Sequence, residues 1–228
     1  MEKPDSMEQA KSLILQAALP HVPFDGWSDA TLNAAITESS VAPGLARALF
    51  PRGGIDLALA HHHQGDRQMI DALAATDLVS LRFRDRIATA VRLRLAHADR
   101  DLVRRGSALF SLPQHTPEGA RAIWGTADAI WVALGDKSND INWYTKRVTL
   151  SAVYASTVLF WLGDDTPGHS ATWDFLNRRI ENVMSFEGAK ARFRENPLGK
   201  ALLNGPLKVL ERVHAPQRPE NLPGRTHR

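Results

Sequence analysis

Residues 148–162 read VTLSAVYASTVLFWL, and none of them is charged. A helix needs about 20 residues to cross a bilayer, so this segment predicts a helix of the protein interior instead. At about 100° per residue, its side chains form two apolar rows on nearly opposite sides. One row is Leu150, Tyr154, Thr157 and Trp161, and the other is Val148, Ala152, Ala155, Leu159 and Leu162. A helix with two apolar sides is typical of a central position, enclosed by its neighbours.

The stretch just before it, residues 139–147, reads NDINWYTKR. Its Asn-Asp pair can cap the helix. Trp143 and Tyr144 are adjacent, so they cannot both point into one core, and at least one is expected near the surface. Aromatic side chains beside two basic residues have the composition of a protein-binding hot spot. The alternative is a tryptophan that folds back over the preceding loop.

The rest of the chain also predicts helices. Its 228 residues, 43% hydrophobic and 23% charged, have the composition of a folded globular protein. Runs of β-branched residues with a period of two are nearly absent, so we predict an all-α fold. The expected helices cover residues 7–19, 29–38, 43–49, 54–75, 79–96, 99–110, 118–134, 143–162, 169–191 and 197–213.

The chain has no cysteine, which excludes disulfides and thiolate chemistry and suits a reducing compartment. Its first residues, MEKPDSMEQAK, are polar and show neither an export signal nor an organelle-targeting pattern. We therefore expect a cytoplasmic protein of bacterial type. The polar, proline-rich end after Ala215 is expected to be disordered.

Residues 1–53 have the layout of a helix-turn-helix, and they resemble the N-terminal domain of TetR-type repressors. The third helix of that layout, PGLARALF at 43–50, offers one arginine among apolar residues. Residues 1–60 carry four basic and seven acidic side chains, a poor balance for neutralising phosphates. We expect a helix-turn-helix kept as scaffold, with no nucleic-acid partner. A TetR-like transcriptional regulator with a hydrophobic effector remains the alternative.

No catalytic or metal-binding pattern stands out. Consecutive histidines on a helix point about 100° apart, so His61, His62 and His63 cannot converge on one ion. We expect a solvated histidine patch there. Asp164, Asp165 and Asp174 flank a loop between two helices, where capping explains them. The sequence therefore predicts no metal, no cofactor and no enzyme activity.

The predicted helix 197–213 is amphipathic, with an apolar half and a largely basic half. The apolar face contains Leu198, Leu202, Leu203, Leu207, Val209, Leu210 and Val213. The basic face includes Lys200 and Lys208. This pattern favours contact with a lipid headgroup layer. An ordinary last helix packed on the domain is the alternative, and Pro206 should kink either one.

Three motifs resemble the coenzyme Q biosynthesis protein nine family of ubiquinone-biosynthesis accessory proteins. They are Asn142-Trp143-Tyr144-Thr145 followed by two basic residues, Asp165-Thr166-Pro167, and Thr172-Trp173-x-Phe175-Leu176-x-Arg178-Arg179. The resemblance covers roughly residues 10–190 and is strongest over 140–184. It implies a TetR-like fold and a non-enzymatic protein that presents isoprenoid quinone intermediates to a partner hydroxylase. The partner surface that it implies consists of Asn142, Trp143 and Tyr144, with Arg147 nearby.

The resemblance also implies a bound isoprenoid or phospholipid, contact with the inner membrane, and a possible homodimer. Trp124, Trp131, Phe160 and Trp161 are expected to wall the lipid pocket. We divide the chain into a degenerate helix-turn-helix (1–53), a lipid-binding domain (54–191), a membrane-contact helix (192–214) and a disordered tail (215–228).

Overall fold

The computed structural model describes residues 6–195 together with Ala215 and Pro216, and all regular structure in these residues is helical, as predicted. The α-helices are α1 Met7–Ala18, α2 Val22–Asp25, α3 Asp29–Glu38, α4 Pro43–Leu49, α5 Gly54–Ala74, α6 Phe83–Ala96, α7 Arg100–Ser111, α8 Thr116–Ala133, α9 Ile141–Leu162 and α10 Ser170–Glu195, with a 3-10 turn at Pro167–His169. The predicted helix 197–213 lies outside the described residues.

Side-chain caps fix four of these helix starts. Ser6, Ser28, Asp99 and Asp140 each accept a backbone N–H from the first turn of α1, α3, α7 and α9. Such a cap contributes about 1 kcal/mol. The predicted start of α6 was early by four residues, because Asp77 accepts the N–H of Val79 and holds a turn there.

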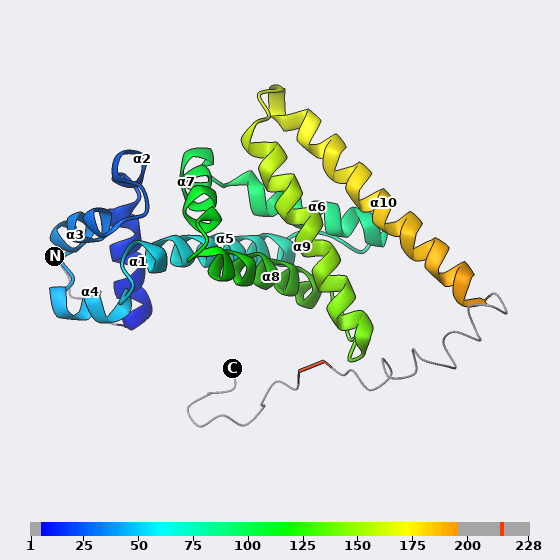
Figure 1. Cartoon of the computed structure of the whole chain (residues 1–228), viewed down its shortest axis with the longest axis horizontal. Coiled ribbons are helices and arrows are strands. Elements are labelled where there is room, and N and C mark those ends of the chain that lie inside the picture. Colours follow the sequence, from blue (N-terminus) through cyan, green and yellow to red (C-terminus); the bar gives the residue numbers. More distant parts are fainter. Residues whose placement is uncertain (1–5, 196–214, 217–228) are drawn as a thin grey trace.

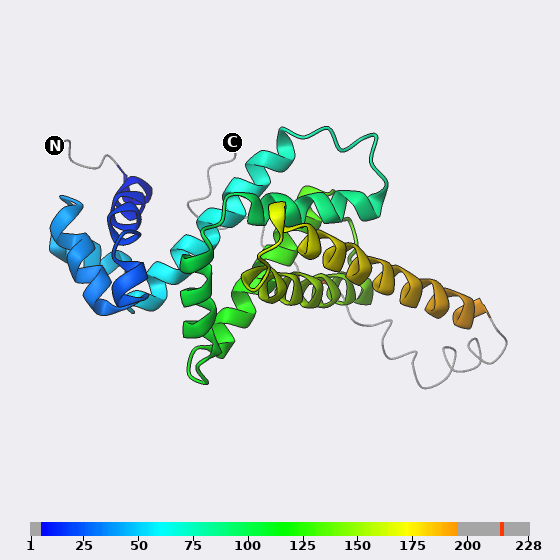
Figure 2. The same ribbon diagram turned by 90° about the horizontal axis from the view of Figure 1, so that it is seen from above.

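Two hydrophobic cores lie along the molecule. The first lies between α1, α3, α4 and the start of α5, and it includes Ile14, Leu32 and Phe50. The second is built by α5, α6, α8, α9 and α10. Helix α5 runs through both parts, from the short blue helices at one end toward the larger bundle at the other (Figures 1 and 2).

The first core carries the helix-turn-helix layout that the sequence predicts. Helix α1 packs across α3 and α4, and the turn between these two contains Ser40 in the left-handed region, at φ 57°. Arg47, the basic residue of α4, donates to the Asn33 side chain of α3 at 3.4 Å. The helix-turn-helix is therefore present as a framework whose third helix carries little charge.

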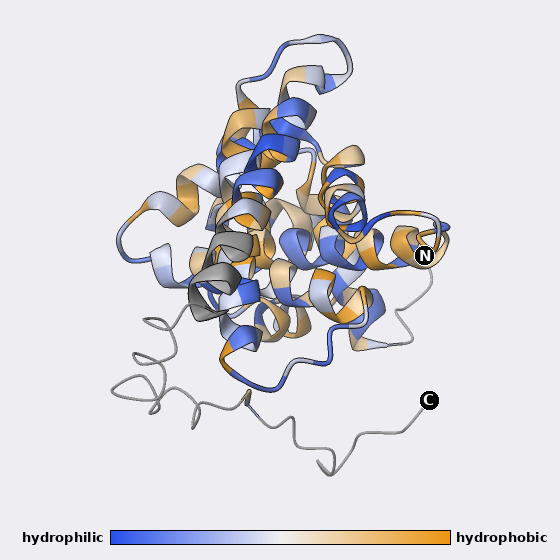
Figure 3. Cartoon of the chain, turned by 90° about the vertical axis from the view of Figure 1, so that its right-hand side faces the viewer, coloured by the Kyte–Doolittle hydropathy of each residue, from blue (hydrophilic) through white to orange (hydrophobic). Residues whose placement is uncertain are grey.

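Helix α9 is buried on one side only. Leu150, Tyr154 and Trp161 face α8 and α10 and are buried, whereas Val148 and Leu159 on the other side are 57% and 67% exposed. The prediction that both apolar sides are enclosed is wrong for the described residues, because α8 and α10 cover one half of the helix. The other helices show the usual mixture of polar and apolar residues along their length (Figure 3).

The loop between α9 and α10 is held by Asp164. Its side chain accepts hydrogen bonds from the N–H and hydroxyl groups of both Thr166 and Thr172, at 2.6 to 2.9 Å. These bonds hold the pKa of Asp164 well below its usual value. The capping role that the sequence suggests for this carboxylate is confirmed.

We expect Asp164→Ala to lower the thermal unfolding midpoint by several degrees, because it removes the acceptor of four hydrogen bonds at the start of α10. The neighbouring Asp165→Ala is the matched control, since the Asp165 side chain is 92% exposed. Differential scanning calorimetry of both variants checks the prediction, and equal midpoints would contradict it.

Candidate functional site

The larger bundle contains an apolar cavity of about 340 Å³ between α5, α6, α7, α8 and α9. This volume lies at the lower end of the range of small-molecule sites, about 300–1,000 Å³. Much of its wall is apolar and includes Leu95, Leu102, Val103, Phe110, Ile123, Val158 and Leu159. We call this space the main pocket. Its composition suits the hydrocarbon part of a ligand.

Small residues on the facing helices leave room for the main pocket. Ala58, Gly106, Ala122 and Ala155 come from four different helices and all line it. At Gly119, a Cβ would collide with the side chain of Phe110, so α7 and α8 can pack this closely only because α8 has a glycine there. The cavity thus exists because alanine and glycine occupy positions where larger side chains would fill the space between the helices.

Polar side chains also line the main pocket. They include His61, His62, Arg94 and Tyr154, and we call these four its polar end. The His62 Nε2 lies 2.8 Å from the Thr126 hydroxyl and 3.1 Å from the Ala122 carbonyl. The pocket therefore joins apolar walls to a small group of hydrogen-bonding side chains.

A buried ion pair lies directly behind this polar end. Arg94 donates from Nε to Asp66 Oδ1 at 2.7 Å and from Nη2 to the His62 carbonyl at 3.0 Å. Thr126 also donates to Asp66 Oδ1, at 2.9 Å. The guanidinium crosses α5 where a side chain on Gly65 would lie, so this pair requires a glycine there.

The two histidines in the main pocket are uncharged at neutral pH. Burial lowers the pKa of both His61 and His62 from 6.5 to about 4. The expected solvated patch is therefore wrong for these two residues, because α5 directs His62 against α8 and His61 against the Trp27 ring, whose centroid lies 5.2 Å away. The side chain of His63 does face solvent, at 53% exposure.

A second apolar pocket, of about 220 Å³, lies between α6, α8, α9 and α10. Its wall includes Phe83, Trp131, Leu150 and Ile180, and Asn142, Thr145 and Lys146 contribute polar atoms. This pocket is separate from the main pocket and lies beneath the start of α9.

Of the four tryptophan and phenylalanine residues expected to wall a lipid pocket, Trp131 lines the second pocket. Trp124 packs against Trp143 with the two rings tilted, their centroids 5.8 Å apart. Phe160 stacks on Phe175 at 4.6 Å, and Trp161 is buried beside His169. Those three line neither apolar pocket of the described chain.

About half of the residues that line the main pocket come from α5, α6 and α7, and of these the sequence analysis considered only His61 and His62, as a solvated patch. The signals that could have found them are His61 and His62 beside an interior glycine of the same predicted helix, together with Arg94 among apolar neighbours. Each signal becomes meaningful only when the three helices are placed side by side.

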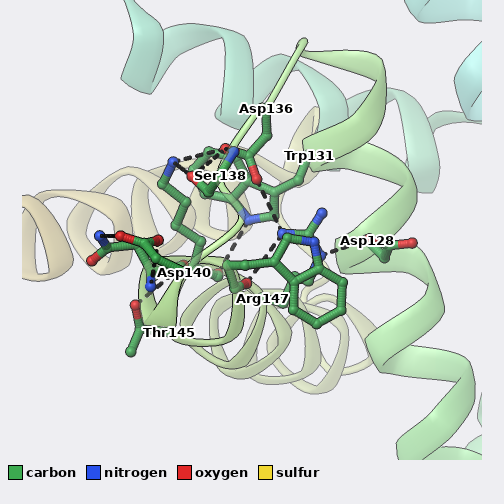
Figure 4. A network of polar contacts seen from close by, with 10 residues as sticks. Asp128, Trp131, Asp136, Ser138, Asp140, Thr145 and Arg147 are labelled. Carbon is green, nitrogen blue, oxygen red and sulfur yellow. Dashed lines mark hydrogen bonds and ion pairs between the residues drawn. The ribbon is translucent and has the colours of Figure 1, made fainter. Parts of the chain in front are cut away.

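The start of α9 forms a cluster of aromatic and charged side chains (Figure 4). Trp143 and Tyr144 are half-buried and meet edge to face, with centroids 4.8 Å apart. The Arg147 guanidinium lies over the Trp143 ring, 4.0 Å from its centroid. The prediction that these two adjacent aromatic residues do not share one buried stripe is confirmed.

Arg147 lies beneath this cluster and is only 2% exposed. It donates to Asp128 at 2.6 Å, to Asp136 at 3.1 Å and to the Trp143 carbonyl at 3.1 Å (Figure 4). Its expected position on the partner surface is corrected: the ion pairs with α8 and the following loop draw the side chain inward. The Arg147 guanidinium therefore packs against one face of the Trp143 ring.

Asp136 connects this network to the loop before α9. Burial by itself would raise the pKa of Asp136, but hydrogen bonds from Lys146, Ser138 and Arg147 lower it from 3.8 to about 2. Ala215, near the described end of the chain, donates its N–H to the carbonyl of Asn139 in the same loop. Of the predicted tail 215–228, only Ala215 and Pro216 are among the described residues.

A carboxylate with a lowered pKa stabilises the fold above its unfolded-state pKa and loses that contribution as the pH falls through the folded value. We therefore expect the Asp136 contribution to be complete above pH 3.8 and to disappear toward about pH 2. Asp136→Asn should flatten the loss of unfolding free energy across this window. Urea titrations at several pH values check this, with the exposed Asp165→Asn as control; equal slopes in wild type and Asp136→Asn would contradict it.

Among the described residues, no three His, Asp or Glu side chains come together as metal ligands. None of the helices in that part of the chain is long and apolar enough to cross a membrane. The predicted membrane-contact segment, from Leu198 to Val213, lies outside the described residues.

The short N-terminal helices, the shared α5 and the larger bundle with its pocket define a TetR-like all-helical protein. The fold is similar to that of a solved TetR transcriptional regulator from Nitrosomonas europaea, with a TM-score of 0.61 and 18% sequence identity over 75% of this chain and 95% of that one. At this identity, the likeness concerns the fold alone.

Sequence comparison goes further. The model of the COQ9 family matches residues 116–187. The chain is 32% identical to the mitochondrial ubiquinone biosynthesis protein COQ9 of Drosophila melanogaster, covering 80% of this chain and 59% of that protein. It is 31% identical to COQ9-B of Xenopus laevis, covering 88% of this chain and 71% of that protein. This chain belongs to the COQ9 family, although it spans about 60% of the length of the Drosophila and Xenopus tropicalis relatives.

Proposed function

We propose that this chain is a non-catalytic accessory protein of ubiquinone biosynthesis that binds an isoprenoid quinone intermediate and presents it to a partner hydroxylase. The observation that carries the proposal is the main pocket, an apolar cavity of about 340 Å³ with one polar end, in a member of the COQ9 family. Its relatives are named ubiquinone biosynthesis proteins.

The shape of the main pocket suits an amphiphile. Each methylene group that leaves water gains about 0.8 kcal/mol, so a prenyl chain requires apolar walls or membrane at every stage of its transfer. Leu159 and Ala120 lie at the edge of the main pocket and are exposed. A tail longer than the cavity would continue over the exposed side of α9, where Val148 and Ala152 follow the same row.

The polar groups of the main pocket support binding rather than catalysis. His62, Arg94 and Thr126 are held by hydrogen bonds to one another and to Asp66. Groups fixed in this way can orient a ligand, whereas general acid or base catalysis needs a side chain that titrates near the working pH. The low pKa of His61 and His62 therefore favours an accessory role.

The partner hydroxylase would dock on the start of α9. Trp143 and Tyr144 form a rigid aromatic pair above Arg147, and Asn142 lies beside them in the first turn. Aromatic residues held in one orientation lose little entropy on binding, which is why such residues dominate interfaces. The basic segment 197–213 would add contact with the surface of the inner membrane, on the cytoplasmic side of a bacterium.

A TetR-like regulator is the second candidate, because the solved neighbour in fold is a TetR transcriptional regulator. Helix α4 offers one basic side chain, Arg47, which is hydrogen-bonded to Asn33. DNA binding would require several phosphate contacts and would weaken steeply with salt. Salt-sensitive binding to the DNA upstream of its own gene would favour this candidate over the accessory protein.

We expect Ala155→Trp to abolish lipid binding, because Ala155 lines the main pocket and an indole would occupy the cavity. Ala48→Trp is the matched control, because Ala48 is an exposed alanine on α4 that lines neither apolar pocket and lies outside the proposed path of the tail. The measurement is mass spectrometry of isoprenoid lipid that co-purifies with each folded variant. Equal lipid content in both variants would refute the assignment of the pocket.

We expect Tyr144→Ala to weaken binding of the partner hydroxylase by about tenfold or more, as is typical for an aromatic hot-spot residue. Phe24→Ala is the control, since Phe24 is 84% exposed and lies on α2 at the other end of the molecule. Surface plasmon resonance with the purified hydroxylase checks the prediction. Unchanged binding by Tyr144→Ala would exclude this surface.

A further inference from the structure

The main pocket has a polar end whose permanent charges cancel, and this bears on the kind of head group that it accepts. Resting on the proposed function, we infer that the pocket selects an amphiphile with an uncharged, hydrogen-bonding head over one with a phosphate or carboxylate. We further infer that Asp66 sets this preference, although it does not itself line the pocket, because it neutralises Arg94.

Arg94 is the permanently charged residue among the described lining residues. Both Arg94 and Asp66 are 7% exposed, and their side chains meet at 2.7 Å. A second donor nitrogen of Arg94 is bound to the His62 carbonyl at 3.0 Å. The guanidinium thus has a fixed counter-ion before any ligand arrives.

An anionic head group would therefore gain little at this end of the pocket. It would lose its hydration and approach Arg94 together with the Asp66 carboxylate, whose like charge opposes it. The same geometry also penalises a cationic head, because Arg94 lies nearer the cavity than Asp66 does and repels a second positive charge. An uncharged head avoids both costs.

The groups that remain for a ligand are neutral. His61 and His62 present imidazole rings, and Tyr154 presents a buried phenol whose pKa burial raises, so it stays protonated. An imidazole or a phenol can donate or accept a hydrogen bond without changing charge. Hydroxyl and carbonyl oxygens on an aromatic ring or at the end of a prenyl chain match these groups.

The test compares three ligands with the same tail: farnesol, farnesyl phosphate and farnesoic acid. The full chain is titrated with each ligand at concentrations below those at which the ligand aggregates. Binding is followed by tryptophan fluorescence. We expect farnesol to bind at least about tenfold more tightly than either anion, because only the anions must desolvate a charge. Equal or tighter binding of the anions would overturn this inference alone, whereas no binding of any ligand would overturn the proposed function as well.

Asp66→Asn provides the sharper arm of the test, because it keeps the shape of the side chain and leaves Arg94 without its counter-ion. We expect this variant to reverse the preference and bind farnesyl phosphate more tightly than farnesol. Asp85→Asn is the matched control: it removes the same charge from α6 at a surface ion pair with Arg82. An unchanged preference in folded Asp66→Asn would exclude the role of Asp66.

A double variant tests the same charge pair if Asp66→Asn alone does not fold. Asp66→Asn combined with Arg94→Gln removes both charges, so no buried charge is left alone. We expect it to keep the wild-type preference for farnesol, and a preference for the phosphate would contradict the inference. If neither variant folds, the three-ligand series with the wild-type chain decides alone.

Discussion

The buried pair of Asp66 and Arg94 is the constraint on which the larger bundle depends. It ties α5 to α6, and Thr126 extends the connection to α8. Removing two charges from water costs several kcal/mol per ion, so a buried pair is maintained only when hydrogen bonds satisfy both partners. Gly65 is required by the same arrangement, since the guanidinium lies where its side chain would be. The polar end of the main pocket is therefore rigid before a ligand binds.

Helix α9 joins the two features that matter for function. Its middle contributes Tyr154, Ala155 and Val158 to the main pocket, and its start carries the cluster around Trp143. Arg147 holds that cluster to α8 through Asp128. A single helix of 22 residues thus fixes the distance between the main pocket and the proposed partner surface. Under the proposed function, the exposed row between them, with Val148 and Ala152, would give a prenyl tail a continuous apolar surface.

The helix-turn-helix at the N-terminal end of the described chain is held together by its own hydrophobic core. The first core includes Ile14, Leu32 and Phe50, and the packing of these residues stabilises the short helices without any contact to DNA. DNA binding would require several positive charges on α4, whereas that helix carries one basic residue, Arg47. The likeness to a TetR regulator therefore describes packing, whereas the COQ9 relatives describe the family.

The sequence by itself determined the helices, because their signals are local. Caps such as Ser28 and Asp140, breaks at glycine and proline, and apolar spacing of three or four residues act within one or two turns. The motifs around Trp143 and Trp173 were enough to identify the family. The position of Asp164 as a cap was also readable, since its partners Thr166 and Thr172 follow within eight residues.

Only the tertiary structure decided which residues share a site. Asp66 and Arg94 are 28 positions apart, and Trp27 donates to the carbonyl of Leu102 across 75 positions. No spacing rule connects such residues, because their proximity comes from the packing of whole helices. For the same reason the sequence analysis placed Arg147 on the surface and His62 in solvent, whereas both side chains lie against α8. Side-chain type is local information, whereas the direction that a side chain faces depends on which neighbouring helix covers it.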